Sequence, residues 1–411
     1  MGIVFSIIVI VPLTLFLLKD ILYKDERIWA FVIFFQHIPL IVFDQIGSEL
    51  IGMGYFVVIV ILYLIKSPKL ILSKSRLSNP ITLSLVLLFG SLLIHFFILD
   101  IDSGNSRGYE TFYRVMLFNL PIIMLCLFSI SGDEEFLTKL MDGLIFYGFF
   151  FLITVIFVSG LAEVGVGERG GFRDDFRISP LAAAKTAGVI SIAAFIKLLN
   201  VDHHKEKLFT LGILTISVLL IFVTASRAAL LFLLIVIVIY LAFANYSIGK
   251  KLLITISFIT ISAFLILIIV QINLPVVQRL QALQNYEQML RFTRLEIVIN
   301  IVKDFEMGII GLGPFGFGHL TGLNYPHNHI AELMVDYGLF GITSLILLII
   351  PAFYYSYWLI TSKNQNFSYI ALLFIYLFLT SLTSGDIVSA RHLQFTAIIM
   401  MNYVIISRKN N

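Results

Sequence analysis

The 411-residue chain has little charge and a single cysteine. Asp, Glu, Lys and Arg make up 13% of its residues. This is about half of the 25% typical of a soluble globular domain and excludes an ordinary soluble fold. Cys126 lies inside an apolar run, so the chain has neither a disulfide framework nor a multi-cysteine metal site. We interpret Cys126 as a packing residue.

Signatures of several enzyme classes are missing as well. There is no P-loop, and the acidic pair in "RDDFR" (173–177) is not the D-x-D of transferases that use nucleotide sugars. No series of acidic residues runs through the apolar segments, as a proton relay would require. We expect neither a cofactor nor a nucleic-acid partner.

What the sequence has instead is hydrophobic runs of roughly 16–25 residues, the length that crosses a bilayer as a helix. The first run has no basic region and no cleavage site, so we predict a retained span. The sequence predicts an all-α polytopic membrane protein with about thirteen spans (12–14) in a single membrane domain over 1–411. The predicted spans are 2–18, 28–44, 48–65, 81–99, 112–130, 141–161, 179–199, 208–225, 228–246, 252–272, 333–359, 367–384 and 392–407.

The Lys/Arg bias of the short connections predicts the orientation. Four basic stretches fall on one side of the alternating map, and we predict that side to be cytoplasmic. They are "KSPKLILSKSRLSNP", "KLLNVDHHKEK", "GKK" and "SRKNN". The long segment 273–332 falls on the outer side. It is the only connection long enough to fold over a site, and we expect it to be a large loop that covers one.

Arginine is concentrated on this outer side. The planar guanidinium binds phosphate and carboxylate with two parallel hydrogen bonds, so an outer face rich in Arg indicates an anionic ligand. The alternative is that each Arg pairs locally with an acidic neighbour or anchors a span at the headgroups. Ten of the thirteen arginines are predicted there: Arg107, Arg114, Arg169, Arg173, Arg177, Arg227, Arg279, Arg291, Arg294 and Arg391.

The turn in "FVTASRAALLF" interrupts an apolar block, 208–246, that is about two spans long. Placing Arg227 in the bilayer centre would cost about 2.5–3.5 kcal/mol, so we predict a turn at the outer boundary. Ser226 would cap the following helix. Arg227 would then point at an anionic headgroup, or it would be an interfacial residue that reaches for water.

The stretch "YEQMLRFTRLEIVINIVKDFEM" (286–307) has apolar residues at helical spacing and predicts an amphipathic helix on which Arg291 and Arg294 share a face. The next residues, "GIIGLGPFGFGHL", contain a G-x-G-x-x-G pattern. We reject a dinucleotide site because no strand precedes it. We predict a tight connection with close backbone approach.

The stretch "YPHNHIAELMVDYGLFG" (325–341) begins a helix at Pro326 that should run on into the span 333–359. The positive end of the helix dipole disfavours imidazolium, so His327 should stay neutral and able to accept a proton. His327 and His329 do not share a helix face, so one of them at most should be catalytic.

The same stretch leaves other interpretations open. His329, Glu332 and Asp336 share a helix face at offsets of three and four. A zinc site from His319, His327, His329 and Glu332 fits no tight metal spacing, and we expect no metal. The polar residues could also simply cap a helix at the membrane interface.

Three stretches, in order, resemble the bacterial O-antigen ligase / O-antigen polymerase superfamily: "TASRAALLFLL", "RLEIVINIVKDFEMGIIGLGPFGF" and "HNHIAELMVDYGLFG". The resemblance implies metal-independent, inverting glycosyl transfer at the periplasmic face of the inner membrane, from an undecaprenyl-diphosphate-linked glycan. It implies that Arg227 and Arg294 bind the diphosphate, with Arg291 beside them. His327 would be the general base and Asn328 would orient or cap it.

The base assignment stays open between His327 and His329. Accessory roles are expected for His329, Glu332, Ser226 and Arg173. Composition favours a polymerase that extends O-antigen or capsule-type glycans on a lipid-linked acceptor, with a chain-length regulator as a partner protein. The alternatives are a ligase that uses the lipid A core as acceptor, and a flippase or transporter. A transporter should show inverted repeats and charge near the midplane.

Overall fold

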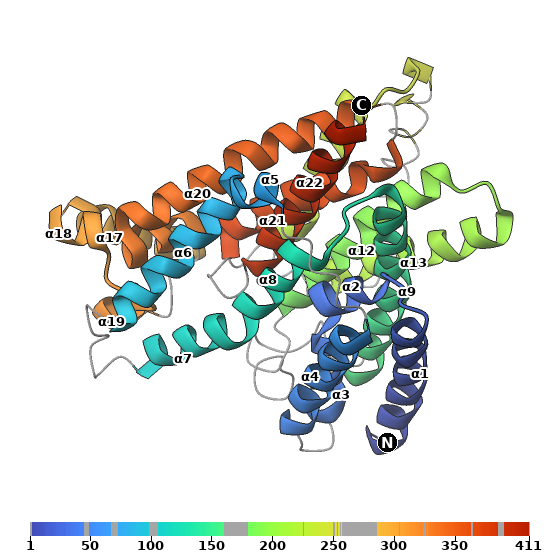
Figure 1. Ribbon diagram of the computed structural model, residues 1–411, viewed down its shortest axis with the longest axis horizontal. Helices are drawn as coiled ribbons and strands as arrows, with labels where there is room; N and C mark the ends of the chain where they lie inside the picture. The colour runs from blue at the N-terminus through green and yellow to red at the C-terminus, as the bar shows by residue number, and fades with distance from the viewer. Residues whose placement is uncertain are drawn as a thin grey trace. The chain divides into compact units, whose positions relative to one another are not determined.

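A computed structural model describes most of the chain, and nearly all of what it describes is helical (Figure 1). The described residues are 2–44, 49–66, 73–97, 106–159, 180–224, 226–249, 251–252, 254, 256, 286–303, 305–323, 326, 328–362, 365–384 and 390–410. Helices account for 89% of the structure, and no strand occurs in the described ranges. The predicted all-α class is confirmed.

Seven described helices are long and apolar enough to cross a membrane. They are Pro80–Phe97, Ser106–Ser129, Glu134–Ile156, Leu181–Asn200, His204–Val223, His329–Thr361 and Gln365–Thr383. Two shorter apolar helices are Ile51–Lys66 and Ala228–Phe243. Every predicted span except 252–272 coincides with a described helical stretch, and that one lies almost wholly outside the described residues. The number of crossings therefore stays a prediction.

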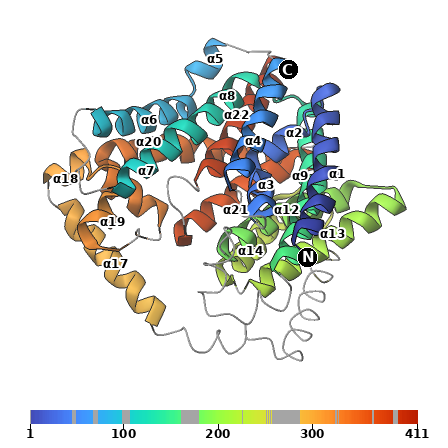
Figure 2. The same cartoon turned by 90° about the horizontal axis from the view of Figure 1, so that it is seen from below.

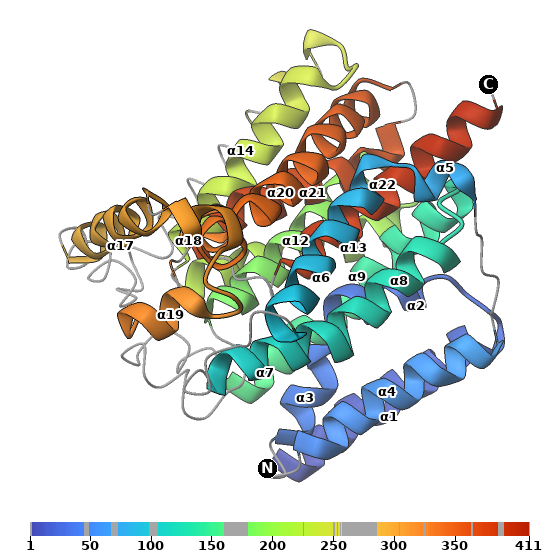
Figure 3. The same cartoon turned by 60° about the vertical axis from the view of Figure 1, so that its left-hand side comes forward.

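The chain folds into two compact units, each built from three separate segments. Unit 1 comprises 1–69, 134–281 and 359–376, and unit 2 comprises 70–133, 282–358 and 377–411. The described helices of unit 1 are α1 (Gly2–Leu22), α2 (Ile28–Ala30), a π-turn (Phe31–Phe35), α3 (His37–Asp44), α4 (Glu49–Lys66), α9 (Glu134–Ser159), α12 (Pro180–Asn200), α13 (His204–Val223), α14 (Arg227–Phe243), a 3-10 turn (Gln365–Phe367) and the first part of α21 (Ser368–Ser384). Within this unit α1 and α4 lie side by side (Figure 3).

Small residues allow the helices of unit 1 to pack closely. In α12 five alanines are buried, and its Ser191 hydroxyl lies 2.8 Å from the Ser217 hydroxyl of α13. A Cβ on Gly188 would lie 2.0 Å from the hydroxyl of Tyr376, so only glycine fits beside this ring. Small residues and interhelical hydroxyl contacts are typical of helix pairs in membranes.

Unit 2 holds the other helices. They are α5 (Lys74–Leu77), α6 (Pro80–Phe97), α7 (Ser106–Arg114), a π-turn (Val115–Asn119), α8 (Leu120–Ser129), α17 (Tyr286–Lys303), α18 (Phe305–Ile310), α19 (Gly316–Thr321), most of α20 (His329–Thr361), the end of α21 (Ser368–Ser384) and α22 (Arg391–Asn410). Helices α17, α18 and α19 gather at the end of α20 where that helix begins (Figures 1 and 2).

Two sets of buried hydrogen bonds hold the helices of unit 2 together. The buried guanidinium of Arg76 donates to the carbonyls of Leu127, Ile130 and Ser131, which would otherwise lack partners at the end of α8. Ser84 on α6 and Ser344 on α20 exchange hydroxyl-to-carbonyl hydrogen bonds of 2.7 and 2.9 Å. The Ser84–Ser344 bonds hold α20 against α6. The site described next lies at the start of α20.

Candidate functional site

Asn328 caps the first turn of α20. Its Oδ1 accepts the backbone N–H groups of Ile330 at 2.9 Å and Ala331 at 3.2 Å, and its carbonyl accepts the N–H of Glu332 at 3.0 Å. Asn is among the preferred N-cap residues because its short side chain replaces the missing helical acceptor. The helix therefore begins at His329, and the predicted start at Pro326 is wrong by about one turn.

The first turns of α20 present two different faces. Ile330, Ala331 and Met334 line a pocket, whereas His329 and Glu332 are buried. Nδ1 of His329 lies 3.4 Å from a carboxylate oxygen of Glu332. The predicted shared face of these two residues is confirmed, because a helix brings positions three apart together.

Asp336 anchors the Gly-rich turn that precedes α20. Its Oδ1 accepts the N–H of Phe317 at 2.9 Å, whereas the N–H of Gly316 donates to the carbonyl oxygen of Gly313 at 2.9 Å. Phe315 has a left-handed backbone, with φ of 58°. The Asp336 carboxylate therefore joins the turn, at Phe317, to α20.

Glycines let the turn and α20 come into backbone contact. Gly311 has φ of 87°, and a Cβ there would lie 2.5 Å from the carbonyl oxygen of Asp336. Gly338 has φ of 54°, and its Cβ would lie 2.4 Å from the carbonyl oxygen of Ile309. The predicted tight connection is confirmed. The prediction of a continuous helix is wrong, because α20 is interrupted at Gly338.

Helix α17 packs against α19 and the start of α20 through a small apolar cluster. Val298 and Ile301 of α17 are buried with Phe317, Ala331 and Val335. The predicted helix over 286–307 is present as α17 followed by the short α18. Because the buried face of α17 contacts the first turns of α20, α17, which bears Arg294, lies beside the N-cap of α20.

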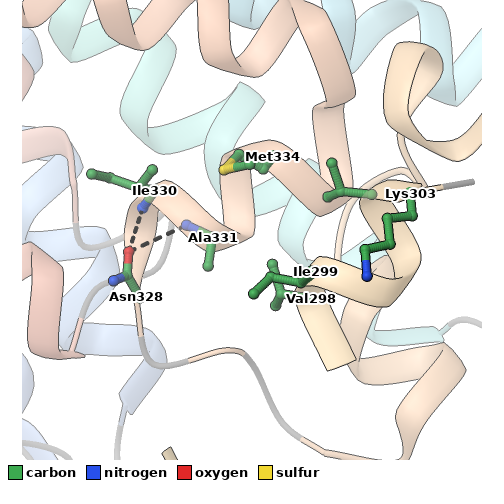
Figure 4. A pocket seen from close by; sticks show the side chains of 8 residues that line it. Val298, Ile299, Lys303, Asn328, Ile330, Ala331 and Met334 are labelled. Carbon is green, nitrogen blue, oxygen red and sulfur yellow. Dashed lines mark hydrogen bonds between the residues drawn. The ribbon is translucent and has the colours of Figure 1, made fainter. Parts of the chain in front are cut away.

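A pocket of about 320 Å³ lies between α17 and the first turns of α20 (Figure 4). Figure 4 shows Ile299 and Lys303 on α17, and Ile330 and Met334 on α20. The lining residues are Val298, Ile299, Val302, Lys303, Asn328, Ile330, Ala331 and Met334. Among the described residues that line it, six are apolar, and the two with polar side chains are Lys303 and Asn328.

The structure describes some of the predicted site residues and not others. His327 and Arg173 lie outside the described residues, and of Arg227 and Arg291 only the helical backbone is described. Arg294 is half-buried on α17, one turn before the pocket residue Val298.

The predicted residues also divide between the units. Arg227 begins α14 in unit 1, whereas Arg294, Asn328, His329 and Glu332 belong to unit 2. Ser226 occupies the predicted N-cap position of α14, yet it makes no side-chain cap bond, and its Oγ is buried without a hydrogen-bond partner. The predicted side-chain cap is therefore wrong.

Metal ligands do not gather in the described part of the chain. No three His, Cys, Asp or Glu side chains within those ranges could hold one ion. His319 is exposed on α19, whereas His329 is buried beside Glu332.

Sequence reasoning missed two residues of this region. Lys303 lies one turn beyond Ile299 on α17, so helical spacing alone could have placed both on one face. His95 of α6 packs edge-to-face on Tyr337, with ring centroids 5.9 Å apart, and a Cβ on Gly313 would lie 3.3 Å from its ring. No local pattern connects position 95 to the Gly-rich turn.

Residues 212–346 match the family model described as O-antigen ligase. The matched region begins within α13 and continues through the Gly-rich turn and the first part of α20. The resemblance to the O-antigen ligase and polymerase superfamily is thereby confirmed. None of the curated proteins compared with the chain matches it.

Proposed function

The chain carries the O-antigen ligase family region over residues 212–346, and from this premise we propose that it is a multi-pass glycosyltransferase of the bacterial inner membrane. It acts at the periplasmic face on glycans linked to undecaprenyl diphosphate. The observation that carries the proposal is the packing of α17, which bears Arg294, against the first turns of α20. The N-cap of that helix, Asn328, directly follows His327 in the chain.

The reaction needs one base and a cationic site for the leaving group. The acceptor hydroxyl oxygen attacks the anomeric carbon of the donor, and the bond from that carbon to the diphosphate oxygen breaks with inversion. The hydroxyl proton passes to the neutral imidazole of His327, a step that typically contributes about 10²–10⁴-fold. The diphosphate leaves with the electron pair, and Arg227, Arg291 and Arg294 neutralise its charge.

The geometry of α20 supports His327 over His329 as the base. His329 lies on the buried face of the helix, 3.4 Å from Glu332. Asn328 lines the pocket, and His327 is its neighbour on the side of the helix start, where the dipole favours a neutral ring. We assign His329 and Glu332 to holding the first turn of α20 in place. Ser226 and Arg173 keep accessory roles near the diphosphate.

We propose a polymerase that extends O-antigen or capsule-type chains on a lipid-linked acceptor, with a chain-length regulator as partner. The support is compositional: outer connections with both signs of charge fit the diverse polymerases. A ligase that uses the lipid A core as acceptor shares the same chemistry and family region, and is the second candidate.

The test is reconstitution of the full-length protein in vesicles with synthetic lipid-diphosphate repeat units, alone or together with lipid A core. We expect longer lipid-linked chains in the first case. Product formed only with lipid A core would replace the polymerase by the ligase. Movement of the repeat unit across the bilayer without any glycosidic product would instead indicate a transporter.

A further inference from the structure

The break at Gly338 separates the first part of α20, residues 329–337, from the rest of the helix. Gly338 has φ of 54° and ψ of −136°, so the backbone leaves the helical path there. The Gly-rich turn bonds to the last turn before this break: the N–H of Gly313 donates to the carbonyl oxygen of Asp336 at 2.8 Å. Carbonyl groups at a helix end need such partners from outside the helix.

The break has a consequence for the direction of residues 329–337. A continuous helix fixes the direction of its own ends, whereas a helix broken at a glycine takes its direction from contacts on either side of the break. The rest of α20 is held against α6 by the Ser84–Ser344 bonds. Contacts between α6 and the first part of α20 therefore help to decide where Asn328, the N-cap, lies.

His95 of α6 makes this contact. It lies in the last turn of α6 and is 4% exposed. Its ring packs edge-to-face on Tyr337, the residue directly before the break, with an interplanar angle of 85°. A Cβ on Gly313 would lie 3.3 Å from its Cδ2, so the same ring also lies against the Gly-rich turn. Nδ1 lies 2.8 Å from the carbonyl oxygen of Ser91 and donates to it, since a carbonyl only accepts, and this bond fixes the orientation of the ring.

We propose that His95 is a positioning residue for glycan transfer. Its ring is held by α6 and packs where the Gly-rich turn joins the first part of α20. It thereby sets the position of Asn328, the N-cap that His327 precedes in the chain. The inference rests on the proposed function, because that function gives the start of α20 its catalytic role. His95 acts by the packing of its ring, so a phenyl ring can replace it and a methyl group cannot.

Five variants test this role. His95→Ala removes one ring of the pair and Tyr337→Ala the other, whereas His95→Phe and Tyr337→Phe keep a ring in each place. Arg76→Met is the control for stability. Arg76 lies on α5, before the first residue of α6, and bonds to the carbonyls at the end of α8, so its loss destabilises unit 2 far along α6 from His95.

The experiment measures the single-turnover rate of glycan transfer at saturating donor by each reconstituted full-length variant, well below its melting temperature. His95→Ala and Tyr337→Ala should each lower the rate about 10–100-fold, because a displacement of about 1 Å can cost about 10²-fold. The two phenylalanine variants should keep most of the rate. The double alanine variant should be no slower than the slower single variant, because both substitutions remove the same contact. Arg76→Met should melt earlier and transfer at the wild-type rate.

A wild-type rate in His95→Ala, or a loss in His95→Phe as large as in His95→Ala, would overturn the positioning role and leave the proposed function standing. A double variant whose loss equals the product of the two single losses would also overturn it. So would a rate loss in Arg76→Met equal to that in His95→Ala, in favour of a general effect of stability. Absence of any transfer by the wild type, with either acceptor, would refute the proposed function together with the inference.

Discussion

Replacing Asp336 with Ala should release the Gly-rich turn from α20. The side chain of Asp336 is buried and accepts the N–H of Phe317 at 2.9 Å. The alanine variant leaves this donor without its acceptor in a site with little access to water. An orphaned buried N–H costs about 1–3 kcal/mol.

For a unit of this size, each kcal/mol lowers the melting temperature by about 2–4 °C. Since one orphaned donor costs about 1–3 kcal/mol, we expect Asp336→Ala to melt about 2–12 °C below the wild type. Asp336→Asn should lose less, because its amide oxygen can still accept the N–H of Phe317.

The assay is thermal unfolding of the purified protein in detergent, followed by intrinsic fluorescence. Asp202→Ala is the matched control, because Asp202 is exposed between α12 and α13, and it should melt like the wild type. An Asp336→Ala variant that also melts like the wild type would refute the assignment of Asp336 as the anchor of the turn.

Three further substitutions test other parts of unit 2 by the same melting assay. Gly338→Ala should destabilise the protein by more than about 1–2 kcal/mol, because φ is 54° and the new Cβ would lie 2.4 Å from the Ile309 carbonyl oxygen. Gly212→Ala in α13 is its control: it meets nothing within 4 Å and should stabilise by up to about 1 kcal/mol. Arg76→Met should cost about 2–4 kcal/mol by orphaning the last carbonyls of α8, and an unchanged melting point would contradict this role. Asn328→Ala should cost about 1 kcal/mol and Asn328→Ser much less, because serine also caps helices; equal losses in both would argue against the cap.

Hydrophobic run length was sufficient to predict the helices, because the bilayer imposes both the length and the helical form of a span. Periodicity was sufficient to pair His329 with Glu332, since three positions separate them on one helix. Both inferences depend on local sequence alone.

The errors lie where a side-chain hydrogen bond or a contact from another segment decides the local backbone. Pro326 is a good first residue for a helix, but the Asn328 side chain bonds to the N–H groups of Ile330 and Ala331 and fixes a later start. A lone glycine inside an apolar helix gives little warning of a break. Gly338 breaks α20 because the backbone of the Gly-rich turn contacts it.

Two further differences from the sequence expectation concern Ser226 and Lys303. Ser226 stands at the N-cap of α14 with φ of −84° and ψ of 88°. Its side chain nevertheless makes no cap hydrogen bond. Lys303 joins the pocket because α17 packs against α20, and sequence spacing alone does not reveal which helix receives that face.

The central claim is that His327 takes the proton from the acceptor hydroxyl. The measurement is the single-turnover rate of glycan transfer from a synthetic undecaprenyl-diphosphate repeat unit by reconstituted wild type, His327→Ala and His329→Ala. His327→Ala should fold and still bind undecaprenyl diphosphate, with its transfer rate lowered about 10²–10⁴-fold. His329→Ala should retain transfer and lose melting temperature. Wild-type transfer by His327→Ala, or a comparable loss of rate confined to a well-folded His329→Ala, would contradict the assignment.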